Sequence, residues 1–379
     1  MNRIALKMLL GDRAKYIMLV SGLTFATLLM TQQSSVFVGL MRWTTATIRN
    51  TRAPVWVVDK KVEQVNEIKA LRDTDLVRVR SVSGISWAVP MYYSVIQARL
   101  ADGSFKQVQL IGLDSTTLIG APSRITKGKL EDLFQNNSRF IDQVGIERLS
   151  QGQGKTIDVG DVLEINDKEA RIVGLCETER SFLGMPYVFT TYERAIEYAP
   201  KQRKMLSYIL AKPIDGLSSE ALARRIEAET GLRAYTEHEF LWSTIWWYIR
   251  NTGIPISFGT TVLLGIVVGI AIAGQTFYSF VLENIRNLGA LKAMGVTDGV
   301  LARMLILQAF TVGFIGYGMG LGLATGFGHA VLKKGQPPFF MPPHVPLFSF
   351  AVITVICAFA ALLGIAKIRK TEPAIVFRG

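Results

Sequence analysis

Long apolar stretches alternate with polar ones along this chain, and four of them are long enough to cross a bilayer, which takes about 20 apolar residues. These predicted spans cover residues 16–40, 254–282, 304–332 and 345–366. A polar segment of different texture, residues 41–253, separates the first span from the second. The pattern therefore predicts an α-helical membrane protein with four transmembrane helices and a large domain between helices 1 and 2.

Short runs of β-branched and aromatic residues, separated by turn residues such as Asp102-Gly103, dominate this inserted segment. The predicted strands cover residues 55–58, 94–100, 108–112, 162–165, 170–173, 186–190 and 208–210. The predicted helices cover residues 191–198 and 218–230, with Asp215 or Ser218 as a cap for the second. The mixture indicates an α+β domain. Changes in the residue pattern suggest an insertion at about residues 116–201.

Basic residues define the topology. They gather in three places: residues 1–15, predicted to be an amphipathic helix, the segment 283–303 between spans two and three, and the tail 367–379. In a four-span protein these three lie on one side, which positive charge marks as cytoplasmic. The α+β domain and the short loop 333–344 then lie outside.

The first apolar run has a second interpretation, since a signal peptide also begins with cations followed by apolar residues. We favour a membrane anchor, because the run from Tyr16 to Met30 is long for a signal peptide and no small-x-small cleavage site precedes Gln32.

Composition narrows the classes of function. Only 19% of the residues are charged, against about 25% in soluble domains. The net charge of +12 comes largely from cations beside apolar spans, so topology explains it better than nucleic-acid binding does. Spans two and four have no ionisable residue between their ends, which disfavours an ion channel or a proton-coupled carrier.

Motifs for catalysis are missing. Cys176 and Cys357 lie in unlike surroundings, so we expect no disulfide, and the three histidines have no metal-ligand spacing. Gly154-Lys155-Thr156 lacks both the earlier glycine and the following helix of a phosphate-binding loop. We therefore predict no catalytic residue, metal or cofactor in this chain.

Glycines in the spans predict close helix packing. Small residues four apart let helix backbones approach each other in lipid. The candidates are Gly265, Gly269, Gly316, Gly318, Gly320, Gly322 and Gly326. Pairing within one chain and pairing between two chains are both open.

Three tryptophans, Trp242, Trp246 and Trp247, precede span two. Trp favours the membrane interface, so we predict interface anchors. Burial inside the outer domain is the alternative.

The segment 283–303 is too short to bury a core of its own. A helix over residues 283–294 places apolar residues three apart on one face, which makes it amphipathic. Gly295 would end that helix and Asp298 would begin the next. Such a helix lies on the bilayer surface, or it is a lever seated in a groove of a cytoplasmic protein, which we favour. The apolar residues are Ile285, Leu288, Leu291 and Met294.

The run from Arg286 to Gly295, RNLGALKAMG, resembles the R-E-I-G-x-L-R/K-A-x-G signature of FtsX/MacB-type ABC transporter permeases. A glycine-rich span follows, and the order of spans and outer domain also matches the family. Within it, length and outer domain are most similar to DevC-like permeases. One position differs: Asn287 stands where the family commonly has Glu, and Glu283 is the candidate substitute.

The resemblance implies a mechanotransmission permease subunit in a bacterial inner membrane, with no enzymatic activity of its own. It implies a homodimer bound to a separate ABC ATPase, which carries the ATP and Mg, and a periplasmic adaptor and outer-membrane channel for efflux. The coupling helix would be the segment with Glu283, Arg286, Asn287, Gly289, Leu291, Lys292 and Gly295. Two alternatives are an FtsX-like scaffold that activates a periplasmic hydrolase and a lipoprotein-release permease.

Overall fold

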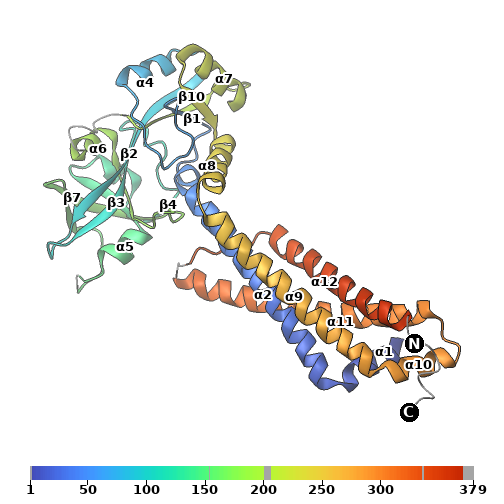
Figure 1. Ribbon diagram of the computed structural model, residues 1–379. Helices are drawn as coiled ribbons and strands as arrows, with labels where there is room; N and C mark the ends of the chain where they lie inside the picture. The colour runs from blue at the N-terminus through green and yellow to red at the C-terminus, as the bar shows by residue number, and fades with distance from the viewer. Residues whose placement is uncertain (1, 153, 200–205, 335–336, 370–379) are drawn as a thin grey trace. The chain divides into compact units, whose positions relative to one another are not determined.

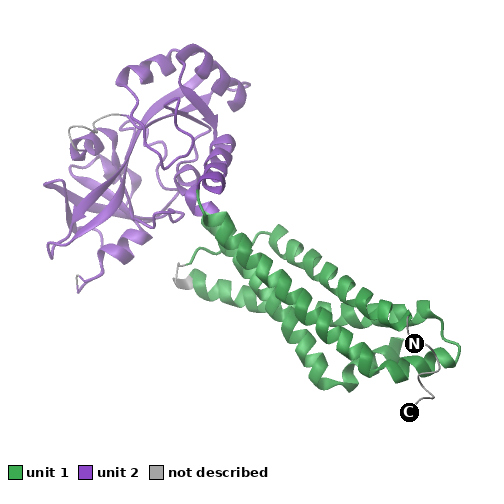
Figure 2. Ribbon diagram, viewed as in Figure 1, with its two compact units in different colours: residues 1–40, 252–379 green, residues 41–251 purple. Residues whose placement is uncertain are grey.

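The computed structural model divides the chain into a helical unit, residues 1–40 and 252–379, and an α+β unit, residues 41–251 (Figure 2). It describes residues 2–152, 154–199, 206–334 and 337–369. Most of the predicted cytoplasmic tail, residues 370–379, lies outside the described residues.

The helical unit holds four helices that are long and apolar enough to cross a membrane, as predicted. The helix of the first span continues at both ends beyond residues 16–40, and that of the third begins at Asp298, so part of the predicted hinge belongs to it. The helices of this unit are α1 (Asn2–Gly11), α2 (Arg13–Thr44), α9 (Ile254–Glu283), α10 (Ile285–Ala293), α11 (Asp298–Lys334) and α12 (His344–Arg369).

One apolar core joins the long helices with α1 (Figure 1). Leu23 from α2, Phe277 from α9 and Leu305 from α11 are all buried in it, together with Cys357 from α12. Ala5 and Leu9, on one face of α1, are buried in the same core. The N-terminal amphipathic helix therefore packs against the spans.

In the α+β unit, a single path of strands runs in the order β10-β1-β9-β2-β3-β8-β5-β7-β4, with β6 beside β2 and β7. The strands are β1 (Val55–Val58), β2 (Ile85–Arg99), β3 (Phe105–Leu113), β4 (Arg124–Lys127), β5 (Ser138–Asp142), β6 (Val162–Ile165), β7 (Lys168–Glu177), β8 (Tyr187–Thr191), β9 (Tyr208–Pro213) and β10 (Arg233–Thr236). Strands β3–β8 and β5–β7 pair in parallel and the others antiparallel, so the sheet is mixed.

Strand β2 connects the two halves of this unit (Figure 1). Its first part pairs with β9, up to Met91, and its second part pairs with β3, from Tyr92 to Arg99. The second half of the unit therefore begins within β2 and ends before β9. This is wider than the insertion predicted at residues 116–201.

Side chains that alternate along β1 fill two different cores. Val55 and Val57 pack beneath α7 with Ile226, whereas Trp56 contacts Phe240 of α8 on the opposite face. Both faces of this part of the sheet are thus covered by helices. The helices of the unit are α3 (Ala46–Thr51), α4 (Asp73–Arg80), η1 (Leu130–Phe134), α5 (Gln143–Leu149), α6 (Tyr192–Tyr198), α7 (Ser219–Thr230) and α8 (Glu237–Asn251).

Helix α7 begins and ends where the sequence predicts. The Ser218 Oγ accepts a hydrogen bond from the Ala221 amide at 3.2 Å, so Ser218 rather than Asp215 is the cap. Gly231, at φ +69°, ends the helix in the left-handed conformation.

Candidate functional site

Helix α10 joins the ends of two predicted spans, α9 and α11, and is the candidate coupling helix. Its inner side packs on the core of the helical unit: Leu288 is 3% exposed, Gly289 is buried and Leu291 is partly buried. Its outer side carries Arg286 and Asn287, both exposed. The amphipathic pattern therefore seats the helix against its own spans and leaves a polar face free.

The end of α10 is a Schellman motif. The Gly295 amide donates to the Lys292 carbonyl at 3.0 Å, and the Val296 amide donates to the Leu291 carbonyl at 3.1 Å. Gly295 has φ +91°, a conformation that costs side chains other than glycine's. Val296 and Leu291 both pack against the core, which completes the motif.

Met294 differs from the prediction. Four apolar residues were expected on one face, but Met294 caps the helix and is 73% exposed. The chain leaves the helical path there, so the periodicity no longer directs the side chain inward. The outer side of α10 consequently combines the Arg286 charge with an apolar side chain at its end, a mixture typical of protein contact surfaces.

Ion pairs fix the surroundings of α10. Lys292 Nζ lies 2.9 Å from Asp298 Oδ1, so it bridges the turn into α11. Glu283, the last residue of α9, forms an ion pair with Lys15 of α2. The Glu proposed to replace the missing acid at position 287 therefore binds a cation of its own chain.

The N-terminal helix is attached at the same end of the unit (Figure 1). The Gln308 Nε2 of α11 donates to the Ala5 carbonyl of α1 at 2.7 Å, in a buried position. Polar contacts of this kind hold helices together where hydrophobic burial gives no advantage. A single sequence does not reveal this pairing, because the partner of Gln308 is a backbone atom.

Four of the predicted packing glycines lie at helix contacts within the chain. A Cβ built on Gly320 would lie 2.6 Å from the Thr24 carbonyl oxygen, and one on Gly316 would lie 2.8 Å from Leu23 Cβ, both on α2. Gly265 and Gly269 of α9 face Met30 and Ala26, which also belong to α2. Helix α2 is therefore contacted closely from two sides.

The other predicted glycines do not share these contacts. Gly318, Gly322 and Gly326 have nothing within 4 Å of a built Cβ. They lie on a different face of α11 from Gly316 and Gly320. Gly318 follows Gly316, and Gly322 follows Gly320, by two residues, which is about 200° around a helix. Close contacts that sequence reasoning missed are those of Gly22 with Ile272 and of Gly313 with Cys357.

The tryptophans belong to α8. Trp242 and Trp246 are 47% and 49% exposed, four residues apart on one face. Trp242 Nε1 lies 3.0 Å from His238 Nε2, and the Arg250 guanidinium lies 5.4 Å from the centre of the Trp246 ring. Trp247 is partly buried and contacts Tyr248 edge to face.

Within the described residues, no cluster of three or more His, Cys, Asp or Glu is placed to hold a metal ion. Gly154-Lys155-Thr156 lies in a loop followed by a turn and β6, and Lys155 Nζ is 2.6 Å from Asp161 Oδ1. That geometry is unlike a phosphate loop, whose anion binds at the start of a helix.

Two family descriptions match this chain. Residues 259–373 match the FtsX-like permease C-terminal domain, and residues 17–229 match the MacB-like periplasmic core domain. The first contains α10, and the second covers more than half of the sequence.

Similar proteins of known sequence are permeases. An uncharacterized ABC transporter permease of Mycobacterium tuberculosis, Rv2563, is 27% identical over 233 residues, which is 59% of each chain. This chain thus spans about three fifths of that relative's length. A second from the same organism, Rv0072, is 23% identical over 81% of this chain and 79% of its own.

Among solved structures, the periplasmic region of MacB from Actinobacillus actinomycetemcomitans is 16% identical, with a TM-score of 0.38. The match covers 54% of this chain and 96% of that one. The extracellular domain of the transporter YknZ, from Gram-positive bacteria, is 13% identical over 48% of this chain and 98% of its own, with a TM-score of 0.36.

Proposed function

This chain belongs to the FtsX- and MacB-like family of ABC transporter permeases, and we propose that it passes the motion of a separate ATPase subunit to its own α+β unit. ATP and Mg²⁺ would bind in that partner. The chain would lie in a bacterial inner membrane, with both termini and α10 in the cytoplasm and the α+β unit in the periplasm.

The observation that carries this proposal is the two-sided structure of α10. A helix that only rested on a bilayer would turn its apolar residues toward lipid. Here Leu288 and Leu291 instead pack into the protein, and Arg286 and Asn287 face outward. A force applied to the outer face would reach α9 and α11 directly, because α10 is joined to both and shares their core.

The cations at this end support the proposed orientation. Arg3 and Lys7 of α1, Arg286 and Lys292 at α10, and Arg369 at the end of α12 belong to segments that share one side of a four-span bundle. Positive charge is typical of the cytoplasmic side.

A second copy of the chain is part of the proposal. Leu263, Leu264 and Val267 of α9 are each more than half exposed. Lipid suits this surface, and so does a helix of another copy, which would pack on it by van der Waals contact. We propose a homodimer that binds two ATPase chains and acts in export with a periplasmic adaptor and an outer-membrane channel.

Affinity purification of the chain in mild detergent, with identification of its partners and an ATPase assay, tests the coupling. We expect a co-purifying soluble ATPase. Arg286→Glu should weaken its binding by about tenfold or more, as expected for loss of a charged hydrogen bond, and lower hydrolysis accordingly. Arg224→Glu, which makes the same charge change on the exposed side of α7, is the control.

Gly289 and Leu291 are poorer probes, since both lie on the inner side and a charge there would disturb folding. Retention of full ATPase binding by Arg286→Glu would refute the role of α10. A co-purifying hydrolase, or a second permease of different sequence, would instead favour the scaffold or the lipoprotein-release alternative.

A further inference from the structure

The loop between β7 and β8, residues 178–186, connects the second half of the α+β unit with the end of α2. Arg42 of α2 holds the Glu179 carboxylate through two groups: its Nε donates to Oε2 at 3.0 Å, and its Nη2 donates to Oε1. Two-pronged arginine–carboxylate pairs of this kind combine charge-assisted bonds with a fixed geometry. Both residues belong to the compact unit of residues 41–251, so the pair lies inside that unit.

Backbone hydrogen bonds strengthen this connection. The Glu179 amide donates to Asn50 Oδ1 at 2.8 Å, and Asn50 Nδ2 donates to the Glu179 carbonyl at 3.0 Å. The Phe182 amide donates to the Trp43 carbonyl at 3.1 Å. Trp43 lies in the last turn of α2, where carbonyls have no partner within their own helix. The loop therefore supplies a partner to the end of α2 and binds α3 as well.

Helix α8 is joined to the same place through Tyr248, which is buried. The Phe182 ring meets the Tyr248 ring edge to face, with 5.0 Å between the ring centres. Asn66 Nδ2 donates to the Thr44 carbonyl at 2.9 Å and to the Tyr248 hydroxyl oxygen at 3.3 Å. Phe182 and Asn66 consequently each bridge α2 and α8.

The far side of the loop is fixed to the second half of the unit. Gln143 of α5 exchanges two hydrogen bonds with the Thr178 backbone, at 2.9 Å with its amide and at 2.6 Å with its carbonyl. Gln109 of β3 is fully buried, and its Nε2 donates to the Met185 carbonyl at 3.1 Å. A displacement of the loop would therefore pass to β3 and α5.

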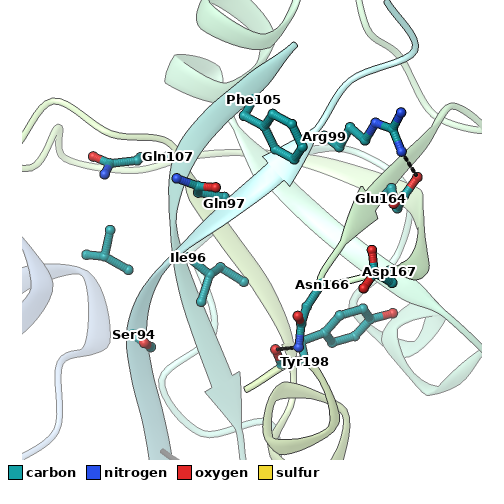
Figure 3. Close-up of a pocket in the computed structure, with 11 residues that line it drawn as sticks. Ser94, Ile96, Gln97, Arg99, Phe105, Gln107, Glu164, Asn166, Asp167 and Tyr198 are labelled. Atoms are coloured by element: carbon teal, nitrogen blue, oxygen red, sulfur yellow. Dashed lines mark hydrogen bonds and ion pairs between the residues drawn. The ribbon is translucent and has the colours of Figure 1, made fainter. Parts of the chain in front are cut away.

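Polar contacts also hold the elements of the second half to one another (Figure 3). Asn166 Nδ2, in the turn between β6 and β7, donates to the carbonyl of Tyr198, the last residue of α6, at 3.1 Å. Arg99 of β2 forms an ion pair with Glu164 of β6, with 3.6 Å between Nη1 and Oε2. The second half would therefore follow the loop as a whole rather than strand by strand.

We propose that Glu179 and Phe182 are positioning residues for the transmission of motion: they couple the ends of α2 and α8 to the second half of the α+β unit. Coupling between distant sites is carried by contiguous hydrogen bonds and packed side chains, and this loop provides both where it meets the two helices. The inference rests on the proposed function, because the motion that these residues transmit would come from the ATPase.

Hydrogen exchange of the full chain in detergent, together with the ATPase that co-purifies with it, tests this role. The amides of residues 178–186 are followed by mass spectrometry, without nucleotide and with ATP plus orthovanadate. We expect slow exchange of the Glu179 and Phe182 amides, equal in the two states, because the loop and both helices would keep their contacts throughout the cycle.

Two variants weaken the connection in different ways. Phe182→Ala removes the ring contact with Tyr248, and Glu179→Gln keeps the side-chain shape but weakens the pair with Arg42. In Phe182→Ala, exchange in the loop should become about two- to tenfold faster, as loss of one aromatic pair allows. In both variants, exchange should now differ between the two nucleotide states. Leu183→Ala, which shortens an exposed side chain on the same loop, is the control and should match the wild type. Thermal unfolding curves check that the variants fold.

The dependence on nucleotide separates coupling from stability. A residue that only stabilised the loop would speed exchange equally in both states, and that result in both variants would overturn the proposal. Fast exchange of the Glu179 and Phe182 amides in the wild type, or protection that falls when ATP and orthovanadate are added, would overturn it as well. Absence of a co-purifying ATPase would refute the proposed function and with it the role in transmission, whereas slow exchange in the wild type would still establish the contacts of the loop.

Discussion

Replacing Gly320 with Ala tests the contact between α2 and α11. A Cβ there would lie 2.6 Å from the Thr24 carbonyl oxygen and 2.6 Å from Thr27 Cβ. Ordinary contact begins at 3.4 Å, so the two helices must separate by about 0.8 Å. Because the nearest atom belongs to the backbone, no side-chain rotation relieves the clash.

The magnitude follows from two opposing contributions. Overpacking costs about 1–3 kcal/mol, whereas Ala in place of Gly stabilises a helix by about 1 kcal/mol. Gly322→Ala and Gly318→Ala add the same methyl group into open space on the same helix, so only the second contribution applies. We expect Gly320→Ala to be less stable than either control by about 1–3 kcal/mol.

Reversible unfolding in mixed micelles, followed by circular dichroism, measures the three free energies of unfolding. The difference in free energy of unfolding between the variants is the informative quantity. Each variant gains the same helix propensity from the Gly-to-Ala change, so that gain cancels in the difference. Equal stability of Gly320→Ala and Gly322→Ala would refute the close approach of α2 and α11, and with it the packing role of Gly316 and Gly320.

Further changes test other parts of the chain. Burial raises the pKa of Asp142 to about 7, so the folded protein keeps a proton that the unfolded chain loses above about pH 4. The free energy of unfolding should therefore fall from about pH 4 to about pH 7 and then level off. Asp142→Asn should remove that fall, as measured by thermal unfolding curves. Arg139 is fully buried, burial lowers its pKa to about 10, and two of its nitrogens have no hydrogen-bond partner among the described residues. Arg139→Met should therefore be neutral or stabilising by up to about 3 kcal/mol, and a clear loss of stability in urea would contradict this. Gly295→Ala should destabilise the end of α10 by about 1–2 kcal/mol because of its positive φ, seen as faster hydrogen exchange there, whereas Gly299→Ala in α11, with open space around it, should not.

The spans and several strands are readable from sequence because local composition determines them. The predicted strands at residues 55–58 and 162–165 coincide with β1 and β6, since each is a short β-branched run between turns. The four spans follow from length and lack of charge alone. Pairings between distant strands, such as the parallel contact of β3 with β8, leave no local pattern and could not be predicted.

Strand β5 shows why other elements were missed. Its sequence, SRFID, contains Arg139 and Asp142, which favour a surface assignment, yet both residues are buried. Their partners lie far away in sequence: Arg139 NH1 donates to Thr190 Oγ1 at 2.8 Å, and Asp142 accepts from Thr178 Oγ1 at 3.1 Å. Tertiary hydrogen bonds of this kind make buried polar groups tolerable, and a single sequence does not reveal them.

At the candidate site, the sequence predicted Gly295 as the end of α10 but misassigned the direction of Met294. The glycine requirement is local, since it depends on one φ angle. Which face of a helix is covered depends on where the helix ends and what packs on it. The same reason separates Gly316 and Gly320, which contact α2, from Gly318 and Gly322, which do not.

The first and last strands of the α+β unit, β1 and β10, are neighbours, with α3 before β1 and α8 after β10. Val55 of β1 pairs with Thr236 of β10, and the pairing continues to Val58 and Arg233. Under the proposed coupling, a relative displacement of the two spans would reach this strand pair through α3 and α8. If both ends moved together, the unit would be carried as a rigid body. If the two ends were pulled apart, the hydrogen bonds between β1 and β10 would break one at a time, and such a strand pair resists little force. Under the proposed coupling, the two ends of the α+β unit would consequently have to move in step.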